Sequence, residues 1–352
     1  MFRLTTRSML VMVPFITLSY VVNANNFMIY GQGHLSADSV DDGEVSSEFV
    51  TSSSSRLGFN GDYQITDKLK VIFQYETGVD LTAQGGNDGN GGAESSGQIF
   101  TKGRPSYVGL SGEFGKILIG HMPALDQWAN DYNLFADQVG DLGNLWEGSG
   151  IPGRLDNVIY YESPDINGAS VAVTYVPEEG KDNTDNLIVK GNYHISGLKI
   201  GAVFASIGQG TASLDDHTAL ALTIGYDFGR FSLGGGVQHE SDIRGLAGDD
   251  RSSYSLGGSA KLGDKGTIKS QFAVSSGEGE NSDARQFAIG YDYALDEDTT
   301  LYIAYARTSN DSNVNFSSNG KGHGDKIVPA FGNDPSAISL GIVAKFDLSF
   351  PL

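Results

Sequence analysis

Six carboxylates lie in one stretch of the chain, residues 122–156, between the short apolar runs 116–121 and 157–162. The same stretch holds both tryptophans and a single arginine, Arg154. Carboxylates that converge on a narrow space attract cations and oppose anions, because low-dielectric walls concentrate their field. A solvated loop face is the simpler interpretation of such a charge run. The six acids are Asp126, Asp131, Asp137, Asp141, Glu147 and Asp156.

The two tryptophans of this stretch, Trp128 and Trp146, suggest either of two roles. Their rings could stack on sugar faces, or they could hold the loop against a wall through apolar burial. Burial is the commoner use of such residues. We therefore expect Trp128 and Trp146 to fasten the loop in place.

A loop of this length is uncommon unless it has a function, and it needs a scaffold that positions it. Elsewhere in the chain apolar and polar residues alternate with a period of two, as in 220–228, 287–293 and 338–350. This period is typical of strands with one apolar and one polar face. Seven short turns alternate with eight longer segments rich in Gly, Asp, Asn and Ser, among them 37–50, 122–156 and 309–336. The sequence therefore predicts sixteen antiparallel strands.

The composition excludes several classes of protein. The chain carries 43 acidic residues against 23 basic ones, so a nucleic-acid partner is not expected. It has no cysteine and hence no disulfide. Residues 1–24 have the layout of a signal peptide, with Arg3 and Arg7 before an apolar run and small residues before a cleavage site after Ala24. The exported chain is then 25–352, and none of its segments resembles a membrane-spanning helix.

An up-and-down array of this size can close on itself and turn its apolar face to lipid. Closure satisfies every backbone group in a medium without water and leaves no sheet edge. Sixteen strands leave an aqueous lumen. We therefore predict an all-β fold, a 16-stranded antiparallel transmembrane β-barrel with short periplasmic turns and long extracellular loops, whose third loop, 122–156, folds into the lumen.

Candidate enzyme chemistry is sparse. The six histidines are scattered, with no HExxH pair, and there is no GxSxG, GxxxxGK[ST] or GxGxxG motif. We expect no catalytic residue, no metal site and no cofactor.

Several motifs resemble the general porins of Gram-negative outer membranes, in the branch of the neisserial and comamonad-type proteins. They are SRLGF at 55–59, GRPSYVGL at 103–110, GEFG at 112–115, RLDN at 154–157 and YESP at 161–164. Their order and spacing span nearly all of 25–352. The resemblance implies a homotrimer in the outer membrane, surrounded by lipid and lipopolysaccharide, with a pore for ions and small hydrophilic solutes that the third loop narrows.

The resemblance also implies a ladder of three arginines on the wall opposite that loop. Arg56 and Arg104 match the first two positions, whereas the third is Tyr160. Strict alternation places Arg104 in phase with apolar Val108, so we expect it to point inward only if Pro105 introduces a bulge. With fewer arginines and many loop acids, we expect a cation-preferring general diffusion channel. A substrate-specific porin, or a secreted β-rich adhesin or lectin, is the alternative.

Overall fold

The structure is a computed structural model that describes residues 24–82, 103–123, 132–146, 153–178, 180, 182–320, 322–324 and 328–350, without the side chains of residues 24, 25 and 146. The predicted signal peptide lies outside these residues except for Ala24, where the first strand begins. Residues 83–102, 124–131 and 147–152 are also outside them.

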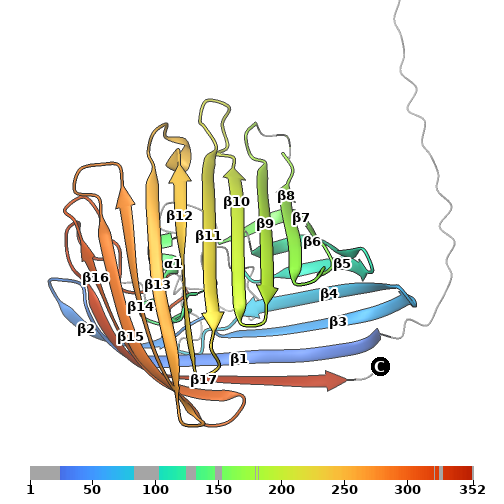
Figure 1. Ribbon diagram of the computed structural model, residues 1–352, viewed down its shortest axis with the longest axis horizontal. Helices are drawn as coiled ribbons and strands as arrows, with labels where there is room; N and C mark the ends of the chain where they lie inside the picture. The colour runs from blue at the N-terminus through green and yellow to red at the C-terminus, as the bar shows by residue number, and fades with distance from the viewer. Residues whose placement is uncertain are drawn as a thin grey trace, which may run out of the picture.

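The described chain is almost entirely β-structure (Figure 1). Its short helices are α1 (Gly143–Trp146) and a single 3-10 turn, η1 (Ile243–Gly245). The strands are β1 (Ala24–Asp41), β2 (Ser46–Ser52), β3 (Arg56–Thr66), β4 (Leu69–Gly78), β5 (Ser106–Gly112), β6 (Gly115–Pro123), β7 (Arg154–Glu162), β8 (Ala169–Val176), β9 (Asn186–Ile195), β10 (Leu198–Ile207), β11 (His217–Asp227), β12 (Phe231–Ser241), β13 (Arg251–Leu262), β14 (Gly266–Gly277), β15 (Ala284–Ala294), β16 (Thr299–Asn310) and β17 (Ser336–Phe350).

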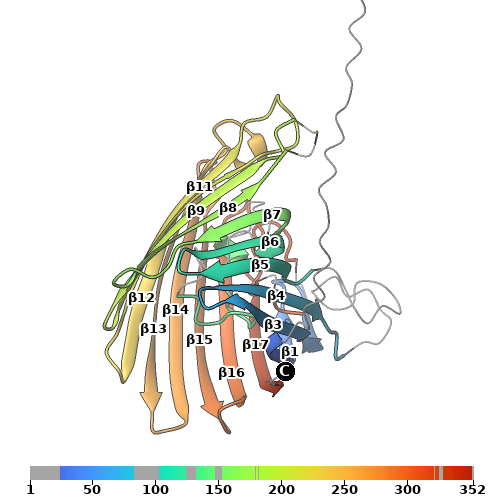
Figure 2. The same cartoon turned by 90° about the vertical axis from the view of Figure 1, so that its right-hand side faces the viewer.

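The sheet is closed, because β1 pairs antiparallel with β17 from Phe27↔Phe350 to Asp41↔Ser336. On its other edge β1 pairs first with β3 and then with β2. The strands β2 and β3 therefore occupy one position of the barrel, interrupted at residues 53–55. With that position counted once, the protein is a closed 16-stranded antiparallel β-barrel, and the prediction of the fold is confirmed. Figure 2 shows the strands inclined along the barrel wall.

The two faces of the wall follow the alternation of the sequence. In β11, Leu220, Leu222 and Ile224 are exposed on the outside, whereas Ala221 and Thr223 between them are buried on the inside. The same pattern recurs in β12 to β17. An apolar outer face and a small or polar inner face suit a wall with lipid on one side and a lumen on the other.

Two predicted loop boundaries were wrong. The segment 37–50 is not a long loop, because β1 continues to Asp41 and β2 starts at Ser46, so only four residues connect them. The third loop is shorter than 122–156, since β6 ends at Pro123 and β7 begins at Arg154. We call residues 124–153 loop L3 and residues 311–335 loop L8. Among the described residues, no helix has the length and apolar character needed to cross a membrane.

Candidate functional site

Residues 132–146 of L3 lie inside the barrel against the inner faces of β11 to β16, and Figure 1 shows α1 within the ring of strands. Small residues in the wall make room for it. A Cβ atom at Gly225 or Gly234 would overlap the ring of Tyr132, and one at Gly290 would lie 2.8 Å from the ring of Phe135. The wall is therefore shaped to receive the loop.

Buried apolar side chains hold L3 to this wall. Phe135, Val139, Leu142 and Leu145 are each no more than 1% exposed. Phe135 and Val139 share one apolar cluster with the inward alanines of β15 and β16. Leu142 and Leu145 belong to a second cluster with inward residues of β6 to β11. L3 is thus held to the wall by residues that were not predicted from the sequence to do so. Trp128 and the side chain of Trp146, which were predicted to hold it, lie outside the described part of the chain.

A buried lysine completes the attachment. The Nζ atom of Lys269 on β14 lies 2.9 Å from Oδ2 of Asp292 and 2.9 Å from Oε1 of Gln138 in L3, and 4.7 Å from the centre of the Phe135 ring. Oε1 of Gln271 accepts a hydrogen bond from the backbone N–H of Leu134 at 3.0 Å. A buried cation with an acid, an amide and a ring as partners fixes one geometry of the loop.

The first two residues of the predicted arginine ladder lie together on the wall of β1 and β3 to β5. Arg56 donates to Oε1 of Gln32 at 3.0 Å. Arg104 is 8% exposed and pairs with Glu76 at 3.5 Å, and Glu76 also accepts a hydrogen bond from Tyr30 at 2.9 Å. Arg104 and Pro105 precede β5, which begins at Ser106, so strict alternation does not apply to Arg104.

Arg104 is also close to two further cationic groups. Burial and the charges of Arg56 and Arg154 lower the pKa of the Arg104 guanidinium, and the charges of Glu76 and Asp137 oppose this shift. An arginine stays charged at neutral pH even so. Arg56, Arg104 and Arg154 therefore form a group of positive charges, with Glu76 and Asp137 near it.

The third ladder position, Tyr160, is on β7 with its side chain toward the interior. Its hydroxyl donates to Oε2 of Glu162 at 2.5 Å, and the same carboxylate pairs with Lys116 at 2.8 Å. Its ring packs against the apolar cluster of Leu142 and Leu145. Tyr160 thus supplies no charge to the arginine group.

The predicted acids of L3 do not act as one set. Asp137 accepts a hydrogen bond from Ser54 at 2.8 Å, between β2 and β3, and its charge affects Arg104. Asp141 is buried within the loop. Its carboxylate accepts from the backbone N–H groups of Asp137 and Gly143 at 2.8 Å each, and from Asn133 at 2.5 Å. Burial raises the pKa of the Asp141 carboxyl, with a further contribution from the charge of Asp137.

Asp156 was wrongly placed in the lumen by the sequence. It is on β7, with a side chain 82% exposed that bonds to His121 at 2.7 Å. Its neighbours Leu155 and Val158 are buried on the inner side, and Asn157 between them has a positive φ of 57°, opposite a shift in register of β6. This bulge turns Asp156 to the outer face. Asp126, Asp131 and Glu147 lie outside the described residues.

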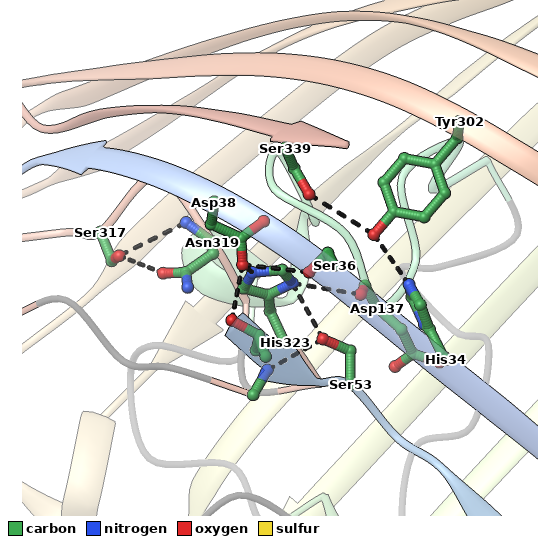
Figure 3. Close-up of polar contacts among 12 residues, drawn as sticks. His34, Ser36, Asp38, Ser53, Asp137, Tyr302, Ser317, Asn319, His323 and Ser339 are labelled. Atoms are coloured by element: carbon green, nitrogen blue, oxygen red, sulfur yellow. Dashed lines mark hydrogen bonds and ion pairs between the residues drawn. The ribbon is translucent and has the colours of Figure 1, made fainter. Parts of the chain in front are cut away.

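The sequence reasoning also missed a second loop inside the barrel. Residues 316–320 and 322–324 of L8 contact both L3 and the wall at β1 and β2, and His323 is buried at their centre (Figure 3). The only signal in the sequence was a histidine in a long polar segment. In the described part of the chain, no group of three or more His, Cys, Asp or Glu side chains could hold a metal ion.

Replacing Gly225 with valine is expected to displace Tyr132 and loosen this end of L3, because the new side chain would occupy the position of the ring. Single-channel current in a planar bilayer should become noisier. The control is Gly191→Val, where a Cβ atom meets nothing within 4 Å. Equal noise in the two variants would contradict the docking of Tyr132 in the wall.

Known proteins share this architecture. Residues 9–313 match the family described as Gram-negative porin. Outer membrane porin protein 32 of Delftia acidovorans is 29% identical over 327 residues, which cover 87% of each chain. A solved anion-selective porin from Comamonas acidovorans superposes with a TM-score of 0.76 at 24% identity, over 91% of this chain and 99% of that one. The trimer form of OmpT from Vibrio cholerae gives a TM-score of 0.69 at 16% identity, over 91% and 99%.

The family match covers most of the sequence, and the inner loop and closed barrel are those of an outer-membrane channel. The chain therefore belongs to the Gram-negative porin family.

Proposed function

We propose that this outer-membrane porin is a general diffusion channel for ions and small hydrophilic solutes, which pass without chemical change. The observation that carries the proposal is the docking of L3 inside a closed barrel, with Arg56 and Arg104 on another part of the same inner wall. A loop held in this way narrows the lumen, and pore width and lining charge decide which solutes pass. No catalytic step is part of this function.

We further propose that the constriction favours anions, in place of the cation preference expected from the sequence. Of the acids expected in the lumen, Asp141 is engaged within L3 and Asp156 is on the outer face. Asp137 and Glu76 remain near Arg56, Arg104 and Arg154. Among the described residues, this part of the pore therefore has an excess of positive charge, which raises the local concentration of anions. The name of the anion-selective porin from Comamonas acidovorans agrees with this direction.

A homotrimer is the proposed assembly, in line with the trimer form of OmpT. Each barrel has an apolar outer face of the kind that contacts lipid or a neighbouring subunit, with an aromatic group near β1 formed by Phe27, Phe59, Tyr75 and Phe350. Contact of the acidic outer loops with lipopolysaccharide, through divalent cations, remains a prediction.

Swelling of liposomes that contain the purified protein tests general diffusion. Neutral sugars should enter at rates that fall with their size and do not saturate with concentration. Saturation by one sugar would support the alternative of a substrate-specific porin. Folded protein that permits no entry of any solute would contradict the channel and favour an adhesin or lectin.

A further inference from the structure

We propose that Lys269 and Gln138 become joined by an amide bond that fastens L3 covalently to the barrel wall. The bond links the Nζ atom of Lys269 on β14 to the side-chain carbonyl carbon of Gln138 in L3, and ammonia is the leaving group. In the structure the two side chains are hydrogen-bonded and not yet joined. The modification is carried out by the chain's own side chains, so it does not depend on which solutes the channel carries.

Lys269 is set apart from other lysines by its burial. Its side chain is 6% exposed. The three other lysines that pair with acids in the described chain are between 37% and 71% exposed, namely Lys68, Lys70 and Lys116. The Phe135 ring lies 4.7 Å from Nζ of Lys269, and Gly290 on β15 leaves room for the stem, since a Cβ atom there would lie 3.4 Å from Cε of Lys269. These contacts keep water away from the amine.

The side-chain carbonyl group of Gln138 lies directly against this amine. Nζ is 2.9 Å from Oε1, and the carbon that the amine attacks is bonded to that oxygen. Small rotations of the two side chains therefore bring Nζ to a near-attack distance, about 3–3.5 Å from the carbon. A turn of L3 holds Gln138 in place, because its backbone N–H donates to the carbonyl of Phe135 at 2.9 Å. The nucleophile and the carbonyl are thus positioned by the fold.

Asp292 on β15 is the base of this arrangement. Its Oδ2 atom lies 2.9 Å from Nζ of Lys269. An amine is a nucleophile only after it has lost its extra proton. Burial disfavours both charges of the pair, so transfer of the proton to the carboxylate costs less here than in water. The second oxygen, Oδ1, is buried without a hydrogen-bond partner among the described residues, so it is free to deliver a proton to the leaving nitrogen.

The reaction is a transamidation that needs no cofactor and no oxidant. Asp292 takes one proton from the Lys269 ammonium, and the amine adds to the side-chain carbonyl carbon of Gln138. Asp292 then gives this proton to the amide nitrogen of Gln138 as the bond between that nitrogen and the carbon breaks. The attacking nitrogen gives up a second proton, which leaves with the ammonia as ammonium. The products are one new amide bond and one ammonium ion, and Asp292 is a carboxylate again.

The bond gives L3 an attachment that cannot open. Apolar burial and hydrogen bonds hold the rest of the loop, and contacts of this kind open transiently in folded proteins. A covalent link at Gln138 keeps the loop at the wall during such openings. Loss of the Phe135 ring admits water beside Lys269, so the Phe135→Ala variant is expected to lack the link as well.

Mass spectrometry of the folded, detergent-purified wild-type protein is the test. The intact mass should be about 17 Da below the mass calculated from the sequence of the processed chain, because one ammonia is lost when the amine is acylated. In a tryptic digest, segment 117–154 should be joined to segment 266–285, because trypsin does not cleave after a modified Lys269. Folded protein with the full calculated mass and with separate segments would overturn the proposal.

Variants assign the lost ammonia to this pair of residues. Lys269→Arg keeps the charge and removes the amine, and Gln138→Ala removes the carbonyl, so both should have the full calculated mass. The control is Gln271→Ala, which removes another glutamine that contacts L3 and should keep the mass loss. Asp292→Asn should slow the appearance of the linked form after refolding by about a hundredfold or more, since it removes the base.

Another source of the same mass loss remains distinguishable. A succinimide at Asn167–Gly168 would also form with loss of ammonia, but it would persist in Lys269→Arg. A mass loss that survives in Lys269→Arg would therefore overturn the proposal. The measurement on the wild type requires no variant to fold, and it is independent of conductance, so its outcome is separate from that of the proposed channel function.

Discussion

Replacing Phe135 with alanine is expected to detach L3 from the barrel wall and to make the channel unstable in its open state. The side chain is fully buried, against the wall at Gly290 and beside the ammonium group of Lys269. Loss of a buried phenylalanine costs about 3–5 kcal/mol, which is large for a loop held by a few contacts. Current through Phe135→Ala channels should be noisier and vary more between channels than current through the wild type.

Phe287→Ala is the matched control for this prediction. Phe287 is on β15, close to the site in the fold, but its side chain is 43% exposed on the outer face. The same chemical change there removes a lipid contact and leaves L3 in place. If both variants gave wild-type currents, or if both lost them equally, Phe135 would not be the attachment point of the loop.

Replacing both Arg56 and Arg104 with serine is expected to change the ion selectivity from anions toward cations. The change removes two of three positive charges and leaves Glu76 and Asp137 in the same region. In a narrow pore the local concentration of ions follows the sign of the lining charge. The permeability ratio of chloride to potassium should fall by roughly threefold or more, because charged clefts can change the local ion concentration by about tenfold or more. The measurement is the reversal potential in a gradient of potassium chloride.

Arg230→Ser controls for the removal of a positive charge as such, because Arg230 lies in the turn between β11 and β12 and is exposed. It should leave the reversal potential unchanged. Arg56→Ser alone should give an intermediate value, since it removes one of the two positive charges and Arg56 is hydrogen-bonded to the neutral side chain of Gln32. A double variant with the selectivity of the wild type would show that the arginine group is not on the ion path.

The barrel could be predicted from the sequence because its lipid-facing residues are apolar at every second position, as with Leu220, Leu222 and Ile224. The apolar–polar alternation does not reveal a strand where the inner face of the barrel is also buried. Segment 37–50 was predicted as a loop because it is rich in Asp and Ser and contains a glycine, yet Asp38 is buried against His323 of L8. A polar network between distant segments leaves no periodic signal in the sequence.

The site was harder to predict, for two physical reasons. One extra residue in a strand reverses the side of every residue beyond it, so the bulge at Asn157 moved Asp156 to the outer face without any change in composition. The contacts of a long loop are also set by the wall it meets. In the sequence, Gly225, Gly234 and Gly290 look like ordinary strand residues. Only the docked loop shows that they make room for L3.

Single-channel recording of the detergent-purified wild-type protein, in a planar bilayer with a salt gradient, tests the central claim most directly. Stepwise insertions in groups of three, with a reversal potential that favours anions, are expected from a trimeric channel with Arg56 and Arg104 at its constriction. A cation-favouring potential would contradict the proposed selectivity, and well-folded protein without conductance would contradict the channel itself.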